Sequence, residues 1–316
     1  MMGVGKRKIL IIGPFGQDGQ IISRLLLKKQ TSVYGIARDK KPESIPLDGI
    51  NYIFGDLSDQ YFSTKILEEI KPDVIIHLAA RHGNSITMSS IEANHSKEIL
   101  GAGSGILVNL IDWLKKQPNT KLLVALSSFM YSGKPKESLI KIDSVHAPKG
   151  VYGEIKVKMH QMLTQARQDF GVDACGMILF NHSSVFSKPG FLIPDLALKI
   201  RSFVDQHLEV LNIEHSNKLV DISNAWDFCE GMIAIMESGH SRDFIFSSGN
   251  LISIKSIVEN AISQLNPSYL NNLNFLPSTD NHSIPIYGDI SETTHLLNWK
   301  PTRSISTTLA EMSQIA

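Results

Sequence analysis

The sequence predicts an α/β fold in which a doubly wound parallel sheet is combined with a smaller, interleaved α/β domain. The first observation is the apolar run at residues 9–12, which ends at a glycine and suits a strand buried on both faces of a parallel sheet. The second is the glycine-rich turn that follows, because residues 21–26 then show apolar spacing typical of a helix. The third is the recurrence of short apolar runs at 32–37, 51–57 and 71–80 and, after a helical region, at 121–126.

The composition is that of a large globular protein, and its charge balance argues against some classes of partner. The chain has 316 residues, 42% of them hydrophobic, enough for one large domain or two that share a core. Basic and acidic residues number 31 each, so nothing favours nucleic acid or an acidic membrane as a partner. Cys175 and Cys229 do not have the spacing of metal ligands, and we expect neither a metal site nor a disulfide. Because no apolar run has membrane-spanning length and residues 1–8 do not resemble a signal peptide, a soluble cytoplasmic protein is expected.

The turn after the first strand carries three glycines spaced G-x-x-G-x-x-G. A strand that turns sharply into a helix directs backbone N–H groups and the positive end of the helix dipole at a ligand, and glycines let a pyrophosphate approach. The pattern therefore favours a dinucleotide, although a glycine-rich turn without a ligand is the alternative. The turn residues expected to contact the dinucleotide are Gly13, Phe15, Gly16, Gln17, Asp18 and Gly19.

The ends of the second and third strands bear on the choice of cofactor. The second strand, 32–37, ends at Arg38, where an arginine would pair with a 2′-phosphate and an acid would accept from a free 2′-hydroxyl. Arg38 thus favours NADP, with NAD as the alternative. Arg38 could also be a solvated residue of a basic loop that has no role in cofactor binding. The third strand leads to Asp56 and Leu57, where the carboxylate could bond the adenine amino group or simply belong to a helix start.

The fourth strand ends in Leu78, Ala79 and Ala80. Small side chains at this position let the backbone pass close beneath a cofactor, so we expect these three residues to contribute to its site. His77 lies inside the apolar run and is expected to pack in the core.

Candidate catalytic residues follow the fifth strand. Ser127 stands at the carboxyl end of strand 121–126, where doubly wound sheets bind ligands. Tyr152 and Lys156 are four residues apart and share one helix face, so the ammonium is expected to lower the pKa of the phenol. The tyrosine would then exchange a proton with a substrate oxygen that Ser127 holds, while hydride passes to or from a nicotinamide. The alternative is that Tyr152 and Lys156 are only neighbours on an exposed helix face. Their position after a glycine-rich turn and a strand that ends in a serine favours a catalytic role.

Four segments resemble one family of enzymes. They are GPFGQDG at 13–19, GDLSD at 55–59, ILFNHS at 178–183 and NWKPT at 298–302. They are similar to motifs of the GDP-mannose 4,6-dehydratases within the extended short-chain dehydrogenase/reductases, and the similarity extends patchily over nearly the whole chain. The resemblance implies a Rossmann-type NADP-binding domain at 1–180, to which 219–262 returns, and a mainly substrate-binding region at 181–316. It also implies a nucleotide-sugar substrate, with a GDP-linked sugar favoured, and a homodimer formed through helices near 107–116 and 152–167.

The resemblance assigns roles to matching positions and also reveals departures. Ser127, Tyr152 and Lys156 match the family's catalytic residues. The substrate contacts expected from it are Ser128, Phe129, Asn181 and Lys218. Phe129 stands where the dehydratases carry the glutamate that removes the proton next to the keto carbon, and a phenyl ring cannot accept a proton. Val220 stands near the position of an arginine that clamps the substrate diphosphate in the family, and residues 280–283 stand where an Arg-Pro pair is usual. Lys218, or His282 in its protonated form, is the expected substitute.

The function expected from these residues is reduction of a GDP-linked 4-keto-6-deoxy hexose by NADPH. It needs only the serine, tyrosine and lysine. The first alternative is a nucleotide-sugar 4,6-dehydratase in which Glu154, His82 or His182 replaces the glutamate. A C4 epimerase is a further alternative, and a non-enzymatic NADP-binding protein is the most distant one.

Overall fold

The centre of the molecule is a seven-stranded sheet with the strand order β12-β7-β5-β4-β1-β2-β3, in which every neighbouring pair is parallel. The computed structural model describes residues 6–39, 46–79, 96–133, 135–278 and 284–314, with only the backbone described at 96–102. The strands are β1 (Arg7–Ile12), β2 (Thr31–Ala37), β3 (Ile50–Phe54), β4 (Val74–His77), β5 (Lys121–Ser127), β7 (Ala174–Leu179) and β12 (Phe244–Phe246). This arrangement confirms the predicted doubly wound fold.

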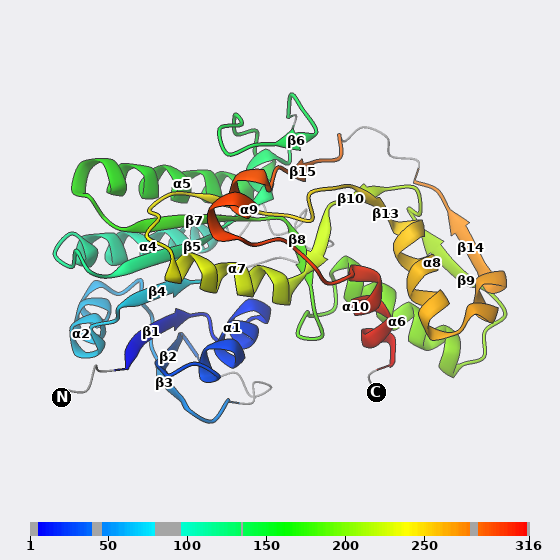
Figure 1. Cartoon of the computed structure of the whole chain (residues 1–316), viewed down its shortest axis with the longest axis horizontal. Helices are drawn as coiled ribbons and strands as arrows, with labels where there is room; N and C mark the ends of the chain where they lie inside the picture. The colour runs from blue at the N-terminus through cyan, green and yellow to red at the C-terminus, as the bar shows by residue number, and fades with distance from the viewer. Residues whose placement is uncertain (1–5, 40–45, 80–95, 134, 279–283, 315–316) are drawn as a thin grey trace.

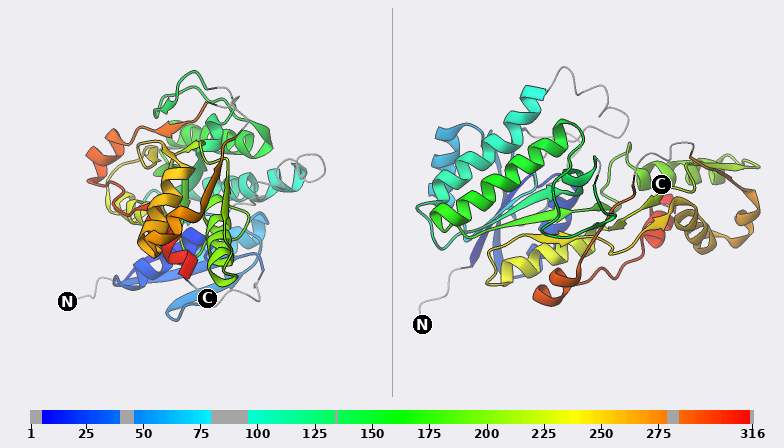
Figure 2. Two further views of the ribbon diagram at one scale, coloured as in Figure 1. Left: turned by 90° about the vertical axis from the view of Figure 1, so that its right-hand side faces the viewer. Right: turned by 90° about the horizontal axis from the view of Figure 1, so that it is seen from above.

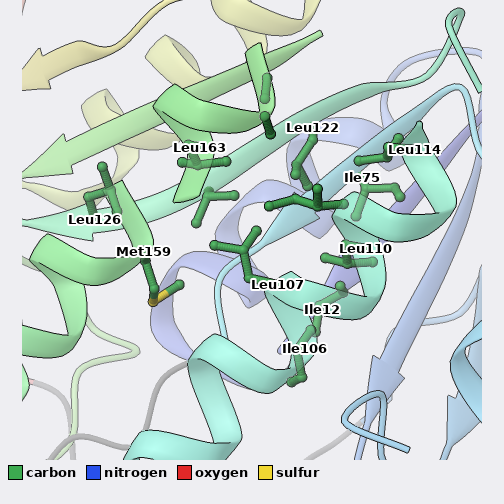
Figure 3. Packing of buried hydrophobic residues seen from close by; sticks show 14 of the residues in the cluster. Ile12, Ile75, Ile106, Leu107, Leu110, Leu114, Leu122, Leu126, Met159 and Leu163 are labelled. Atoms are coloured by element: carbon green, nitrogen blue, oxygen red, sulfur yellow. The ribbon is translucent and has the colours of Figure 1, made fainter. Parts of the chain in front are cut away.

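Helices cover both faces of the sheet (Figure 1). One face is covered by α2 (Gln60–Ile70), α4 (Ser96–Leu114) and α5 (Gly150–Phe170), and the other by α1 (Gln17–Leu27) and α7 (Ala225–Glu237). Because side chains alternate along a strand, Leu10 and Ile12 belong to the first core and Ile9 and Ile11 to the second. Figure 3 shows the first core, where Leu107 and Leu110 of α4 and Leu163 of α5 pack with Ile75 and Leu122 of the sheet.

A second, smaller body lies beyond the carboxyl edge of the sheet, at the right of Figure 1 and of the right-hand view in Figure 2. It contains α6 (Leu192–Asp205), α8 (Ile254–Leu265) and α10 (Ile305–Gln314), with the parallel pair β9 (Leu211–Glu214) and β14 (Leu273–Leu276) and the 3₁₀ helix η2 (Pro267–Asn272). The core of this body unites side chains such as Ile200, Ile257 and Leu309, all with no exposed surface.

Further short elements complete the structure. They are the pairs β8 (Asn181–Ser183) with β11 (Ile222–Asn224), β10 (Leu219–Val220) with β13 (Ile252–Ser253), and β6 (Leu139–Ile140) with β15 (Tyr287–Gly288), together with η1 (Ser128–Tyr131) and α9 (Ser291–Leu297). Some of them, among them η1 and α9, pack on the cores of the sheet. Between α6 and α8 the chain returns to the sheet as α7 and β12, so the bodies are interleaved. The domain ranges given above stay a prediction, but α8, which lies in the segment expected to return to the sheet, packs with α6 and α10 instead.

Individual packing predictions can be compared with this core. His77 is 1% exposed, and burial, together with the charge of Lys156, lowers its pKa to about 4, as a core histidine requires. Trp299 is buried and Trp226 partly buried. The sequence patterns above do not identify β7 as a strand. In the described part of the chain, no helix has both the length and the apolar character needed to cross a bilayer.

Candidate active site

The glycines at the turn from β1 into α1 differ in how closely the backbone packs around them. Gly13 has φ +92°, and a Cβ there would lie 3.0 Å from the Ala79 nitrogen; at Gly19 a Cβ would lie 2.2 Å from the Gly13 carbonyl oxygen. A Cβ at Gly16 would meet only the Gly13 oxygen, at 3.6 Å. Gly13 and Gly19 therefore allow close backbone packing. Gly16, the N-cap of α1, has no side-chain cap and leaves open space at the helix start. These residues fit a dinucleotide pyrophosphate.

Two further parts of the predicted cofactor site lie beside this turn. The Phe15 ring stacks on Tyr52 of β3, with centroids 5.1 Å apart, and lies 6.4 Å from the ring of Phe54. Neither β3 aromatic was identified from the sequence. Arg38, directly after β2, is exposed and its Nε lies 3.0 Å from a carboxylate oxygen of Asp39. The arginine therefore lies at the predicted end of the strand, in an exposed ion pair of small energetic value.

Asp56 shapes the turn that follows β3. Its Oδ1 accepts from the Ser58 nitrogen at 2.9 Å and the Ser58 hydroxyl at 2.7 Å, whereas the N-cap of α2 is Asp59. Leu57 is 2% exposed and belongs to the core, so only its backbone is available to a ligand. Asn109 of α4 donates to the carbonyls of Leu57 and Ser58, at 3.0 Å each, and fixes this turn; sequence reasoning missed it.

The end of β4 completes the predicted cofactor edge. Leu78 and Ala79 are partly buried and lie against the Gly13 turn, the Leu78 nitrogen donating to the Ile12 carbonyl at 2.9 Å. Ala80 lies outside the described residues. All of these segments follow parallel strands and therefore meet at one edge of the sheet.

Ser127, Tyr152 and Lys156 are brought together at the same edge. Ser127 ends β5 and is hydrogen-bonded to the phenol of Tyr152 in the first turn of α5. The Lys156 Nζ lies 5.6 Å from the centroid of the Tyr152 ring and donates to the Ala125 carbonyl at 2.6 Å. The i, i+4 spacing thus places both side chains on the face of α5 that meets the end of β5.

The predicted direction of the tyrosine pKa shift is wrong for this structure. Burial raises the pKa of Tyr152, the charge of Asp18 raises it further, and the hydrogen bond with Ser127 offsets only part of this. Burial also lowers the pKa of Lys156 to about 8. Desolvation penalises the charged form of each group and is the largest cause of both shifts. At neutral pH the phenol is therefore a neutral proton donor.

Phe129 occupies the loop directly beside the tyrosine. Its ring meets the Tyr152 ring edge-on, with centroids 5.6 Å apart. Ser128 is buried, and the Phe129 carbonyl accepts from the Ser132 hydroxyl at 2.9 Å. The position that carries a base in the dehydratase pattern is therefore apolar and packed against the phenol.

The replacement bases considered above can be compared with the structure. Glu154 is exposed. His182 is partly buried, and both of its ring nitrogens face acceptors: the Asp18 carboxylate at 3.0 Å and the Phe180 carbonyl at 2.7 Å. A ring that donates from both nitrogens has no lone pair with which to take a proton. His82 lies outside the described residues.

The predicted substrate contacts lie where the two bodies meet and in the second body. Asn181 begins β8 and its amide donates to the Asp221 carbonyl at 3.3 Å. Lys218 is half-buried directly before β10, and its carbonyl accepts from Ile254 at the start of α8. Val220 lies in β10. The second clamp position, 280–283, lies outside the described residues.

Sequence reasoning also missed contacts between the turn and β8. Gln17 Oε1 accepts from the hydroxyls of Ser184, at 3.1 Å, and of Ser187. Asp18 pairs with His182, which lies 164 positions further along the chain. The only indication of these contacts in the sequence is that GQDG and NHS both lie in motifs that resemble those of the family.

Comparisons with known proteins identify the family of this chain. The family model described as GDP-mannose 4,6 dehydratase matches residues 10–312. GDP-mannose 4,6 dehydratase of Cricetulus griseus is 24% identical over 344 residues, covering 99% of this chain and 92% of the relative; GDP-mannose 4,6-dehydratase of Vibrio cholerae is 26% identical over 266 residues, covering 80% and 71%.

Solved structures share the fold. dTDP-glucose 4,6-dehydratase of Bacillus anthracis in complex with NAD superposes with a TM-score of 0.79 at 15% identity, covering 98% of this chain and 96% of that one. UDP-glucose 4-epimerase of Thermotoga maritima gives a TM-score of 0.81 at 16% identity, covering 97% of each chain. With a family model that extends over residues 10–312, from the end of β1 to α10, this chain belongs to the GDP-mannose 4,6-dehydratase family.

Proposed function

We propose that this enzyme transfers hydride between C4 of a nucleotide-linked hexose and a nicotinamide cofactor. The observation that carries the proposal is the hydrogen bond between Ser127 and Tyr152, formed at the sheet edge that also holds the glycine-rich turn. Lys156 lies one helical turn from the phenol. A GDP-linked sugar is favoured because the curated relatives are named for GDP-mannose.

The chain's own residues handle the proton. Ser127 and Tyr152 would both present their oxygens to one substrate oxygen. When C4 is oxidised, the phenolate of Tyr152, the minor form at neutral pH, takes the hydroxyl proton; when a ketone is reduced, the neutral phenol donates that proton. Lys156 is oriented by its hydrogen bond to Ala125, which holds its charge beside the phenol ring. When bound, the nicotinamide supplies or accepts the hydride.

The cofactor would be held by the turn at residues 13–19 and by the segments after β2, β3 and β4. NADP is the proposed form because Arg38 can pair with a 2′-phosphate, and NAD is the alternative. Solved relatives of this fold carry NAD. The homodimer and the cytoplasmic location stay predictions from the sequence.

The proposed overall reaction is 4,6-dehydration, in which oxidation at C4 precedes loss of water. The family model and the curated relatives support this alternative better than the 4-ketoreductase that the sequence first favoured. Elimination requires a base. Of the three considered, the exposure of Glu154 and the contacts of His182 argue against these two residues, so His82 is the proposed candidate.

The 4-ketoreductase is the second candidate, and one observation favours it specifically. Phe129 packs edge-on against Tyr152 where elimination would need a carboxylate. Ketone reduction needs only a hydride and a proton, and an apolar neighbour that keeps the phenol neutral assists proton donation.

Two incubations separate these reactions. Purified protein is mixed with NADP and GDP-mannose, and separately with NADPH and GDP-4-keto-6-deoxymannose, while coenzyme absorbance and product mass are followed. Loss of water without net coenzyme change supports dehydration, and a product two hydrogens heavier with coenzyme consumed supports ketone reduction. Tyr152→Phe should abolish either reaction and leave cofactor binding intact. Cofactor binding without turnover of either sugar would instead favour a non-enzymatic NADP-binding protein.

A further inference from the structure

His182 is held as a cation against the glycine-rich turn. Its Nε2 lies 3.0 and 3.1 Å from the two oxygens of the Asp18 carboxylate, and its Nδ1 lies 2.7 Å from the Phe180 carbonyl oxygen. A carbonyl and an ionised carboxylate can only accept, so both ring nitrogens must carry protons. With Asp18 ionised, these contacts correspond to an imidazolium–carboxylate pair, and both side chains are largely buried.

The surroundings of this pair come from three elements. Gln17 of α1 donates to Asp18 Oδ1 at 3.2 Å and to the His182 carbonyl at 3.3 Å. From α7, the Phe228 ring packs on the imidazole at 4.8 Å and the Cys229 thiol donates to the Asp18 carbonyl at 3.6 Å. The charge of Asp18 also raises the pKa of the Tyr152 phenol, on α5. Burial alone would lower the pKa of His182, but the Asp18 carboxylate outweighs this and raises it.

Asp18 occupies the first turn of α1, where the helix dipole and the glycine turn would attract a pyrophosphate. A carboxylate there repels the phosphates, whereas a carboxylate paired with a cation does not. We propose that His182 is a positioning residue of the cofactor site: its protonated ring neutralises and orients Asp18, so that cofactor binding weakens when His182 loses its proton. This inference rests on the proposed function, which requires a dinucleotide at the turn.

Two residues of α1 hold the segment that carries His182 against the glycine-rich turn. Gln17 also accepts from Ser184 and Ser187, so the segment that carries His182 is attached to the turn by side chains of two neighbouring α1 residues. Cofactor affinity should therefore depend on a residue that touches the turn and not the dinucleotide.

The test is the dissociation constant of NADH and of NADPH, measured by titration calorimetry from about pH 6.5 to about pH 9.5, where histidine titrates and no phosphate of NADH does. Because Lys156, with a pKa of about 8, also titrates in this range, all proteins are compared in the Lys156→Met background as well. Wild-type affinity should fall about tenfold as pH rises. His182→Gln should show the weak affinity at every pH. Asp18→Asn combined with His182→Gln should recover affinity over the single variant and stay independent of pH, which loss of a merely structural contact would not produce.

A matched control is His160→Gln, which removes another partly buried histidine that pairs with an aspartate, Asp243, away from the turn. It should keep the wild-type pH dependence of cofactor binding. A wild-type dissociation constant that does not change with pH, or a double variant that binds no better than His182→Gln, would overturn the inference. Wild-type protein that binds neither coenzyme at any pH would overturn the proposed function itself, so the two failures are distinguishable.

Discussion

The rings of Phe129 and Tyr152 meet at an angle of 81° with their centroids 5.6 Å apart. This edge-to-face contact places an apolar group against the candidate catalytic phenol, in the loop where the dehydratase pattern carries a carboxylate. Such a neighbour helps to exclude water, and burial raises the pKa of the phenol. One substitution relative to the family pattern thus removes a base and favours the neutral acid.

Phe129→Glu should increase dehydration of GDP-mannose by about 100-fold, because general bases contribute at least that much to proton abstraction. Product mass and rate of water loss are the measurements. The matched control is Phe129→Gln, which has a similar shape and cannot accept a proton. Equal rates for the two variants would show that a carboxylate at this position does not act as the base.

The activity should also depend on the charge of Lys156. Burial lowers its pKa to about 8, so the ammonium loses its proton as pH rises through that value. We expect kcat/KM to decline above about pH 8 in the wild type. Lys156→Met should be slow and lack this decline. A wild-type profile that stays level well above pH 8 would contradict a role for the charge.

Asp243 should make the folded state sensitive to acid. Its carboxylate receives two hydrogen bonds from Arg167, at 2.6 and 2.7 Å, and one from His160 at 2.8 Å. Burial opposes ionisation, but these bonds outweigh it and lower the pKa of Asp243 from 3.8 to about 2. Because the folded pKa lies below the unfolded one, the stabilisation is complete above about pH 4 and is lost as pH falls toward 2; it amounts to about 2 kcal/mol.

The check on Asp243 is the free energy of unfolding in urea, measured in the wild type and in Asp243→Asn. The variant should be less stable by about 3 kcal/mol at neutral pH, because it leaves Arg167 buried without its partner. The difference should shrink below about pH 4. A constant difference down to pH 2 would show that ionisation of Asp243 does not contribute.

Alanine substitutions in the turn should separate folding from cofactor binding. Gly19→Ala places a Cβ 2.2 Å from the Gly13 oxygen and should lower the melting temperature strongly. Gly16→Ala has 3.6 Å of room and an extended backbone, so its melting temperature should stay close to wild type. Its affinity for NADPH should fall about tenfold, because the methyl group occupies the open space at the helix start. Unchanged affinity in Gly16→Ala would place the pyrophosphate elsewhere.

Arg38→Ser tests the coenzyme preference. If the guanidinium pairs with the 2′-phosphate, the variant should bind NADPH about tenfold more weakly and NADH unchanged. The two dissociation constants are compared by fluorescence titration. A parallel loss for both coenzymes would mean that Arg38 acts only through its loop and its ion pair with Asp39.

The sequence allowed prediction of those parts that depend on local patterns. Strands β1 to β5 are predicted because buried parallel strands are apolar runs, and the grouping of Ser127, Tyr152 and Lys156 follows from helical spacing after a strand end. Strand β7 is harder to identify because its run is interrupted by Gly176, where a Cβ would lie 2.5 Å from Asp243. That requirement comes from tertiary packing.

Properties that depend on burial or on distant partners were not predictable. The pKa of Tyr152 shifts upward because the fold removes it from water, whereas the spacing of Tyr152 and Lys156 indicated only their mutual attraction. Likewise, the pairing of Asp18 with His182 joins segments 164 positions apart. No local pattern encodes such a contact.

Trp299, near the C-terminal end of the sequence, completes the core that α1 and α7 form on the sheet. Its indole packs on Phe246 with ring centroids 4.8 Å apart and donates to the Asp227 carbonyl at 2.7 Å, inside the core that α1 and α7 form on the sheet. During synthesis, β1 and the glycine turn emerge first, but this core stays incomplete until Trp299 has been made. We therefore expect a nascent chain to expose the apolar face of α7 to chaperones from the time α7 emerges until Trp299 has left the ribosome.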